Sequence, residues 1–322
     1  MYRDLDAAEL AARLGTADEP YLVDVREPDE FRAWSIPGAV NVPLGQLTQR
    51  IGELPGDREL VSICASGNRS AAAAEAMTRA GLRVANLAGG MSAWAVVYDA
   101  VALELGEAQV VQVRRRAKGC LSYLAGAGDE AFVIDPSMDT DVYVRIAAAH
   151  GWRISRVFET HLHADHLSGA RALAEATGAS LHLNPADPFE LGFLPLGDGD
   201  SFELPGGPVV QAAHTPGHTR GSTVYLVDGR AVLSGDTLFV DGVGRPDLAE
   251  RAAEFAHALY GSLHRRLAGL ACETLVLPGH YGEGVVVQPD RAVAATLGGL
   301  RRSLEALSYD EDRFVAWATA SC

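Results

Sequence analysis

The segment THLHADHLSG at 160–169 brings three histidines and one aspartate together within a few positions. Imidazole nitrogens and carboxylate oxygens are the ligands that zinc and non-haem iron commonly take in proteins. His161 and His163 are two apart at the end of a strand-like run, so both can face the same side, while Asp165 and His166 fall near the first turn of a following helix. The segment therefore predicts a metal centre. Its ligand types alone do not choose between zinc and iron.

Three more candidate ligands follow β-type runs later in the chain. His214 ends PVVQAAH, Asp236 follows RAVLSG, and His280 follows TLVLPG. Because functional side chains gather where strands end, we expect these residues to join the histidine segment at one edge of the sheets. His218 lies in the turn TPGHTRGS, and we expect it to be a turn residue or to support a ligand rather than to bind the metal.

A second reactive segment, CASGNRS, lies between the strand-like ELVSI and an Ala-rich helix. Its backbone N–H groups can bend towards the sulfur of Cys64, while Gly67 permits a tight turn and Arg69 adds positive charge. Such a cradle at a helix N-terminus should lower the pKa of the thiol and stabilise a thiolate or a persulfide. A buried, inert cysteine is the alternative. The expected contacts to bound sulfur come from Cys64, Ala65, Ser66, Gly67, Asn68 and Arg69.

The spacing of apolar residues and the positions of turn-forming residues predict the helices and strands that hold these residues. In the first hundred residues, strands are expected at 21–25, 39–42, 59–63 and 83–87, and helices at 6–14, 27–34 and 70–81, as in an α/β domain with a parallel sheet. A boundary is placed between residues 104 and 105, giving domains 1–104 and 105–322. The second domain opens with β-rich runs and contains the strands that lead to the candidate ligands.

Composition restricts the partners. With 322 residues, two domains are expected, and a net charge of −15 disfavours nucleic acid and anionic membranes. Charges in MYRDLDAAEL argue against a signal peptide, and no apolar run is long enough to cross a membrane. The four cysteines are widely spaced, which suits a reducing compartment. We expect a cytoplasmic enzyme, and a homodimer agrees with how often soluble enzymes dimerise.

The first domain resembles the single-domain rhodaneses. VDVREPDEF, IPGAVNVPL, CASGNRS and LAGGMSAW occur in that family's order. The resemblance implies that Cys64 carries sulfane sulfur as a persulfide and that Arg69 closes the loop. A phosphatase of the dual-specificity or arsenate type is the rival, but its loop has five residues between cysteine and arginine, whereas this loop has the four residues 65–68. The shorter cradle suits sulfur better than phosphate.

The second domain resembles the metallo-β-lactamase superfamily, through HxHxDH and the three later ligands. The resemblance implies an αββα sandwich with metal at the sheet edges, but it leaves the reaction open. In a binuclear zinc hydrolase of the glyoxalase II type, one ion takes His161, His163 and His214, the other takes Asp165, His166 and His280, and Asp236 bridges them. In a persulfide dioxygenase, one Fe(II) per chain is held by His161, His214 and Asp236, and the other four residues surround them.

Two further features favour the dioxygenase. GRPDL at 244–248 is similar to an element of the persulfide dioxygenases and places Arg245 at the substrate, although Arg245 and Asp247 could be a surface ion pair. Only 42 residues follow His280, with one clear helix in LGGLRRSLEAL, which is short for a glutathione-binding extension of glyoxalase II.

Tyr281 follows His280 directly, a departure from the commonest dioxygenase spacing, and it is expected to contact substrate. Cys120 is expected to be structural.

The joined halves give one hypothesis. Fe(II) and dioxygen would oxidise a low-molecular-weight thiol persulfide, such as glutathione persulfide, to sulfite and thiol, while Cys64 exchanges sulfane sulfur with thiosulfate or sulfite. Two zinc ions and thioester hydrolysis remain the alternative. A non-catalytic scaffold is disfavoured, because the cysteine loop and the ligand set are both intact.

Overall fold

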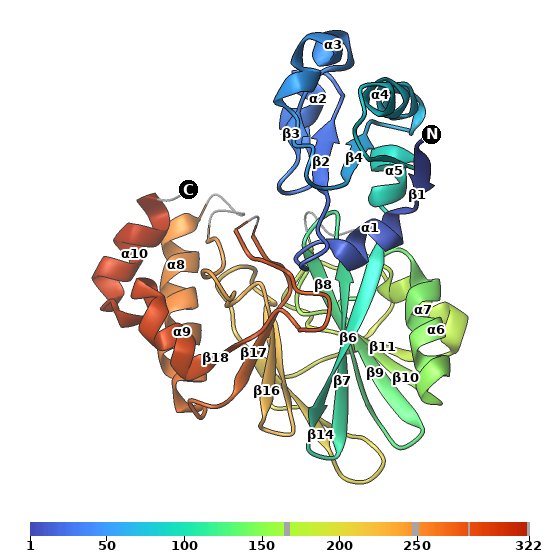
Figure 1. The fold of residues 1–322 in the computed structure, drawn as a ribbon. Coiled ribbons are helices and arrows are strands. Elements are labelled where there is room, and N and C mark those ends of the chain that lie inside the picture. Colours follow the sequence, from blue (N-terminus) through green and yellow to red (C-terminus); the bar gives the residue numbers. More distant parts are fainter. Residues whose placement is uncertain (164–167, 247–250, 283, 321–322) are drawn as a thin grey trace. The chain divides into compact units, whose positions relative to one another are not determined.

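The computed structural model describes residues 1–163, 168–246, 251–282 and 284–320, which form two compact units (Figure 1). The first unit contains residues 1–99 with the short segments 114–119 and 286–291. The second contains residues 100–113, 120–285 and 292–322. The division expected at 104/105 falls within strand β6 (Tyr98–Leu105), close to the point where the chain leaves the first unit.

The first unit is built on a parallel sheet with the strand order β1-β5-β4-β2-β3. All residues of β4 and β5 are buried, as expected of central strands covered on both faces. The expected α/β fold is confirmed. The strands are β1 (Arg3–Leu5), β2 (Tyr21–Asp24), β3 (Val40–Asn41), β4 (Leu60–Ile63) and β5 (Val84–Leu87), and the helices are α1 (Ala7–Arg13), α2 (Pro28–Ala33), α3 (Leu47–Arg50), α4 (Asn68–Arg79) and α5 (Gly90–Trp94), with 3-10 turns at Leu44–Gln46 and Ile51–Glu53.

One arginine ties the separate segments of the first unit together. The fully buried guanidinium of Arg114 donates to Asp99 Oδ1 at 2.5 Å. It also donates to the backbone carbonyl oxygens of Gln288, Pro289 and Arg291 at 2.7–3.1 Å. A guanidinium can satisfy several acceptors at once, so this side chain fixes the segment 286–291 against strand-end residues distant in sequence.

The second unit contains two mixed sheets. The seven-stranded sheet has the order β12-β11-β10-β9-β8-β7-β6, and the six-stranded sheet has the order β13-β14-β15-β16-β17-β18. Their remaining strands are β7 (Ala108–Arg115), β8 (Cys120–Ala127), β9 (Glu130–Ile134), β10 (Arg153–Phe158), β11 (Ser180–Leu183), β12 (Leu194–Pro195), β13 (Ser201–Glu203), β14 (Val209–His214), β15 (Thr223–Val227), β16 (Ala231–Gly235), β17 (Leu275–Pro278) and β18 (Ala295–Thr296).

Helices cover the outer face of each sheet (Figure 1). Aromatic side chains join the inner faces, where the ring of Phe158 on β10 lies 5.0 Å from Phe202 and 5.2 Å from Tyr225. The predicted αββα sandwich is therefore confirmed. The helices are α6 (Thr140–His150) and α7 (Ala170–Thr177) on the first sheet, and α8 (Ala252–Gly261), α9 (Leu297–Ser303) and α10 (Glu311–Ala320) on the second, with a π-helical turn at Ser262–Arg266 and 3-10 turns at Leu267–Gly269 and Glu305–Ser308.

None of the helices in the described ranges is long and apolar enough to cross a membrane.

Candidate metal centre and cysteine loop

Three side chains from the ends of different strands meet in the second unit. His161 follows β10, His218 lies in the turn after β14, and Asp236 directly follows β16. One ligand atom from each lies within 4.8 Å of the other two. The Nε2 atoms of His161 and His218 lie 3.9 Å and 3.8 Å from Oδ2 of Asp236. The cluster is therefore made of two nitrogens and one oxygen that face one another.

The ring orientations of both histidines suit a bound metal. His218 Nδ1 lies 3.1 Å from the backbone oxygen of Arg245, which can only accept, so Nδ1 carries the hydrogen. The Thr160 hydroxyl donates to Asp135, so its oxygen accepts from Nδ1 of His161 at 2.8 Å. In both rings the lone pair is thereby left on Nε2. Burial, with the neighbouring His163, holds the pKa of His161 well below its usual value, which keeps the ring neutral.

The separations also fit a single ion. Two ligand atoms that each lie about 2.1 Å from one ion are at most about 4.2 Å apart. The separations of Asp236 Oδ2 from the two histidine nitrogens, 3.9 Å and 3.8 Å, are below that limit. His161 and Asp236 are also well buried, with 3% and 9% of their surface exposed. The donors and their spacing therefore fit a two-histidine, one-carboxylate metal face.

His218 occupies the place that was predicted for His214. His214 is the last residue of β14, and its Nε2 lies 2.7 Å from the backbone oxygen of Arg220. The described cluster does not include it. The chain continues into a tight turn at Gly217, where φ is +144° and a Cβ would come within 2.4 Å of the Leu259 backbone. This close approach, open only to glycine, brings His218 back to the cluster.

His280 and His163 adjoin the cluster but are bonded to carboxylates. His280 Nδ1 lies 2.7 Å from Asp236 Oδ1, whereas the contacts of His161 and His218 are with Oδ2. Burial lowers the pKa of His280, but hydrogen bonds with Asp236 and Cys120 raise it to about 11. Cys120 thus contacts the site rather than being only a core residue. The other two predicted members, Asp165 and His166, lie outside the described residues.

Two buried carboxylates that were not predicted from the sequence hold His163. His163 Nε2 lies 3.1 Å from Asp135 Oδ1 and 3.0 Å from Glu159 Oε2. Burial raises the pKa of Glu159 to about 7, although His163 lowers it. Together the three residues form a second group that could hold a cation. The available signal was their position, since Asp135 directly follows β9 and Glu159 directly follows β10.

A cavity of about 560 Å³ opens beside the cluster and is lined in part by His163 and His218. Arg220, Arg251 and the ring of Phe255 also line it. The predicted substrate contacts Arg245 and Tyr281 do not line this cavity. Arg245 is exposed, and its backbone holds His218, while Tyr281 is half-buried next to His280. Substrate contact through their side chains stays a prediction.

In the first unit, the sulfur of Cys64 is enclosed at the end of β4. The Gly67 N–H donates to Cys64 Sγ at 3.1 Å, and the Ser70 hydroxyl donates at 3.3 Å. Burial raises the pKa of the Cys64 thiol, but hydrogen bonds from Ser70, Ser66 and Gly67 lower it below its ordinary value. The predicted cradle is therefore present, and Ser70 is a donor that the sequence analysis did not identify.

The remaining predicted loop residues differ in their exposure to solvent. Ser66 and Asn68 are exposed and Ala65 is half-buried. The Arg69 guanidinium makes two bonds of 2.7 Å and 2.8 Å to the carboxylate of Glu30. That pairing lowers the pKa of Glu30 to about 2. Arg69 thus keeps its charge near Cys64 while Glu30, which was not predicted, fixes its direction.

The titration of Cys64 gives a first test. We expect its thiolate to form at a lower pH than that of an ordinary cysteine, because the loop donors stabilise the charged form. Ser70→Ala removes one donor and should move the midpoint upwards. Ser66→Ala is the matched control, since Ser66 contributes its backbone N–H, and it should leave the midpoint unchanged. Ultraviolet thiolate absorbance, with Cys64→Ser as the blank, measures this; equal midpoints in wild type and Ser70→Ala would contradict it.

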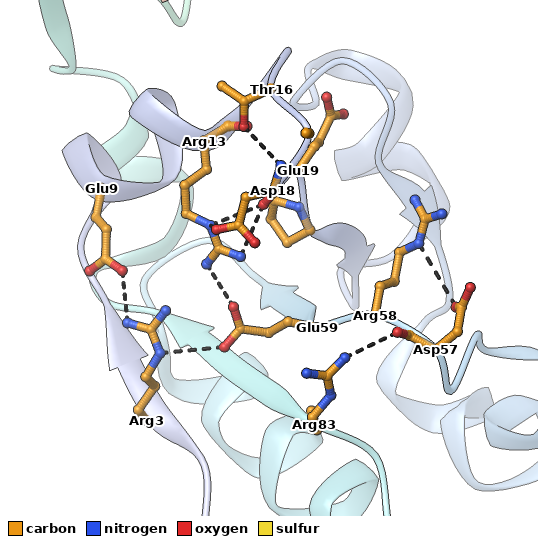
Figure 2. Close-up of a pocket in the computed structure, with 12 residues that line it drawn as sticks. Arg3, Glu9, Arg13, Thr16, Asp18, Glu19, Asp57, Arg58, Glu59 and Arg83 are labelled. Carbon is orange, nitrogen blue, oxygen red and sulfur yellow. Dashed lines mark hydrogen bonds and ion pairs between the residues drawn. The ribbon is translucent and has the colours of Figure 1, made fainter.

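The first unit also contains a cavity, of about 860 Å³, which is lined by arginines and carboxylates (Figure 2). Arg13 bonds Glu59 at 2.6 Å, and Arg3 bonds Glu9 at 2.8 Å and Glu59 at 3.4 Å. Figure 2 also shows the contact of Arg83 with the backbone of Asp57, at 3.1 Å. Since these arginines already have partners, the network is better explained as a stabilising element than as an anion site.

Glu59 should therefore contribute to stability. Burial raises the pKa of Glu59, but the hydrogen bonds with Arg13 and Arg3 lower it overall. Its contribution to stability is therefore present above the ordinary pKa of about 4.3. That contribution is lost as the pH falls through the lower pKa of the folded state. Glu59→Gln should lower the free energy of unfolding by about 1–2 kcal/mol at pH 7, as measured by urea denaturation. Glu9→Gln, at a more exposed pair, should cost less than about 1 kcal/mol. A Glu59→Gln effect that grows on acidification would contradict this assignment.

Each of the two parts of the chain is similar to a known protein family. Residues 115–280 match the family described as the metallo-beta-lactamase superfamily, and residues 6–96 match the rhodanese-like domain. A hydroxyacylglutathione hydrolase from Anaeromyxobacter dehalogenans is 35% identical over 189 residues, which are 56% of this chain and 71% of that protein.

Two solved structures resemble the fold. The structure of ETHE1 from Myxococcus xanthus has a TM-score of 0.56 and 30% identity, and the match covers 69% of this chain and 90% of that one. A metallo-beta-lactamase from Staphylococcus aureus subsp. aureus COL has a TM-score of 0.59 and 28% identity, and that match covers 65% of this chain and 66% of the other.

Proposed function

Because the chain belongs to the metallo-beta-lactamase superfamily and also carries a rhodanese-like domain, we propose that it is a persulfide dioxygenase coupled to sulfur transfer at Cys64. The substrate would be a low-molecular-weight thiol persulfide such as glutathione persulfide. The balanced reaction is RSSH + O₂ + H₂O → RSH + HSO₃⁻ + H⁺, in which the sulfane sulfur gives up the four electrons that dioxygen takes.

The cluster of His161, His218 and Asp236 carries this proposal. A face of two histidines and one carboxylate with open positions is typical of non-haem Fe(II) oxygenases. When bound there, Fe(II) would supply the redox chemistry that dioxygen needs. Asp236 has its second oxygen bonded to His280, which favours one ion on this face over a bridge between two. The similarity to the ETHE1 structure agrees with this assignment.

The chain's own residues bind and orient the substrate. The cavity beside His218 is large enough for a tripeptide-sized thiol, and Arg220 and Arg251 at its wall would attract carboxylates. Phe255 offers an apolar surface that excludes water from part of the cavity. His280 holds the orientation of Asp236, and the backbone of Arg245 holds that of His218.

Cys64 would perform the sulfur transfer. Its thiolate attacks the outer sulfur of thiosulfate, the sulfur–sulfur bond of thiosulfate breaks, and sulfite leaves, so that CysS⁻ + S₂O₃²⁻ gives CysSS⁻ + SO₃²⁻. The Gly67 N–H and the Ser70 hydroxyl, which already bond the sulfur, would stabilise this anion. A thiol then takes the outer sulfur as a persulfide and regenerates Cys64.

A binuclear thioester hydrolase is the second candidate, because a relative of 35% identity is a hydroxyacylglutathione hydrolase. One experiment separates the two. Protein purified without oxygen should contain about one iron per chain and consume dioxygen with glutathione persulfide. Two tightly bound zinc ions, with rapid hydrolysis of S-lactoylglutathione and no dioxygen uptake, would establish the hydrolase instead.

A further inference from the structure

Asp187 is a buried carboxylate that no motif in the sequence identifies. It lies in the loop after β11, with 4% of its surface exposed. Three neutral donors bond its two oxygens. The Leu162 N–H and the Thr219 hydroxyl donate to Oδ2 at 2.9 Å and 2.7 Å, and the Gly221 N–H donates to Oδ1 at 2.6 Å. These bonds offset the cost of burying the charge.

The donors belong to the two loops that carry the histidine ligands. Leu162 lies between His161 and His163, and Thr219 directly follows His218. Asp187 therefore joins the loop after β10 to the loop after β14. It also lines the cavity into which His163 and His218 face.

The fit around this carboxylate is tight. A Cβ on Gly221 would lie 2.7 Å from Cγ of Asp187, so the loop can approach only because residue 221 is glycine. Asp135, another buried acid near the histidines, differs from Asp187 in the segments that it bonds. It accepts from Thr160 N at 2.6 Å and from the hydroxyl of the same residue at 2.8 Å, both within the first histidine loop.

We propose that Asp187 is a positioning residue of the metal centre, which sets the separation of His161 and His218 by bonding both of their loops. The inference rests on the proposed metal site. An asparagine is isosteric, but its NH₂ group would face the backbone N–H of either Leu162 or Gly221, so at least one bond to the loops must break. The histidines would then be freer to separate, and outer-shell losses of this kind cost about 10- to 100-fold in metal affinity.

The test is a Co(II) titration of the full-length chain after chelation, read by the dissociation constant and the ligand-field spectrum. Asp187→Asn should raise the dissociation constant about 10- to 100-fold and alter the spectrum. Thr219→Val, which removes one of the three bonds, should have a smaller effect in the same direction. Asp200→Asn is the matched control, because Asp200 is an exposed carboxylate that accepts a backbone N–H of Gly197 at 2.7 Å, and it should bind like wild type.

Wild-type affinity and an unchanged spectrum in Asp187→Asn would overturn the inference, whatever happens to the stability of that variant. If Asp187→Asn does not fold, Thr219→Val provides the test, and wild-type Co(II) affinity with an unchanged spectrum in that variant would overturn the inference. A wild-type chain that binds no Co(II) would instead overturn the metal centre itself, and the proposed function with it.

Discussion

His218→Ala is expected to remove the metal from the purified protein and to abolish dioxygen uptake with glutathione persulfide. The substitution deletes one of three side chains whose ligand atoms lie within 4.8 Å of one another. Since the loss of outer-shell partners alone costs up to about 100-fold, the loss of a ligand should reduce metal affinity by more than about 100-fold. Metal analysis after anaerobic purification, together with an oxygen electrode, measures both effects.

His214→Ala is the matched control, because it removes a histidine only four positions earlier in the same segment. Its ring contacts the Arg220 backbone and takes no part in the cluster. The variant should keep its metal and most of its activity. The opposite result, with metal lost from His214→Ala and kept by His218→Ala, would contradict this assignment. It would favour His214 as the ligand, as predicted from the sequence.

The fold was largely predictable because most elements carry a strong local pattern. Strands β4, β5 and β8 are buried throughout and consist mostly of apolar residues, which the sequence displays directly. Strand β6 was missed. It is an edge strand whose outward positions include Ala100 and Ala102, so small residues hide the alternation of Val101, Leu103 and Leu105. Helix α10 was also missed, and tertiary packing of Phe314 and Ala318 holds it in place.

The candidate site was predictable only in part, because its residues lie in turns. Asp236 directly follows β16 and His161 lies three residues beyond the end of β10, so the sequence could place both at a sheet edge. The path of the chain after β14 depends on how Gly217 packs against Leu259, a contact between distant segments that spacing cannot reveal. The supporting acids Asp135, Glu159 and Asp187 likewise acquire their roles through tertiary hydrogen bonds.

The cysteine loop shows the same limit. Its order of residues predicted a cradle for sulfur, and the bond from the Gly67 N–H is present. The partner of Arg69 is Glu30, which lies 39 positions away along the chain. Nothing in the loop itself identifies that partner.

Cys64→Ser is expected to abolish thiosulfate:cyanide sulfur transfer while leaving dioxygen uptake with preformed glutathione persulfide nearly intact. Serine keeps the size of the side chain but supplies no thiolate, so no persulfide can form and the transfer rate should fall to that of the uncatalysed reaction. Cys272→Ser is the matched control, because Cys272 is exposed and lies outside the loop, and it should transfer sulfur like wild type.

Asp236→Ala should give the reverse pattern, with sulfur transfer retained and dioxygen uptake lost, because Asp236 belongs to the metal cluster and not to the cysteine loop. The pair of variants therefore tests whether the two chemistries are separable. If Cys64→Ser also stopped the oxidation of a persulfide supplied from outside, the persulfide on Cys64 would have to be an obligatory intermediate. The cavity beside His218 could then not be the entry point for a free thiol persulfide, and the substrate assignment would have to be replaced by a protein-bound one.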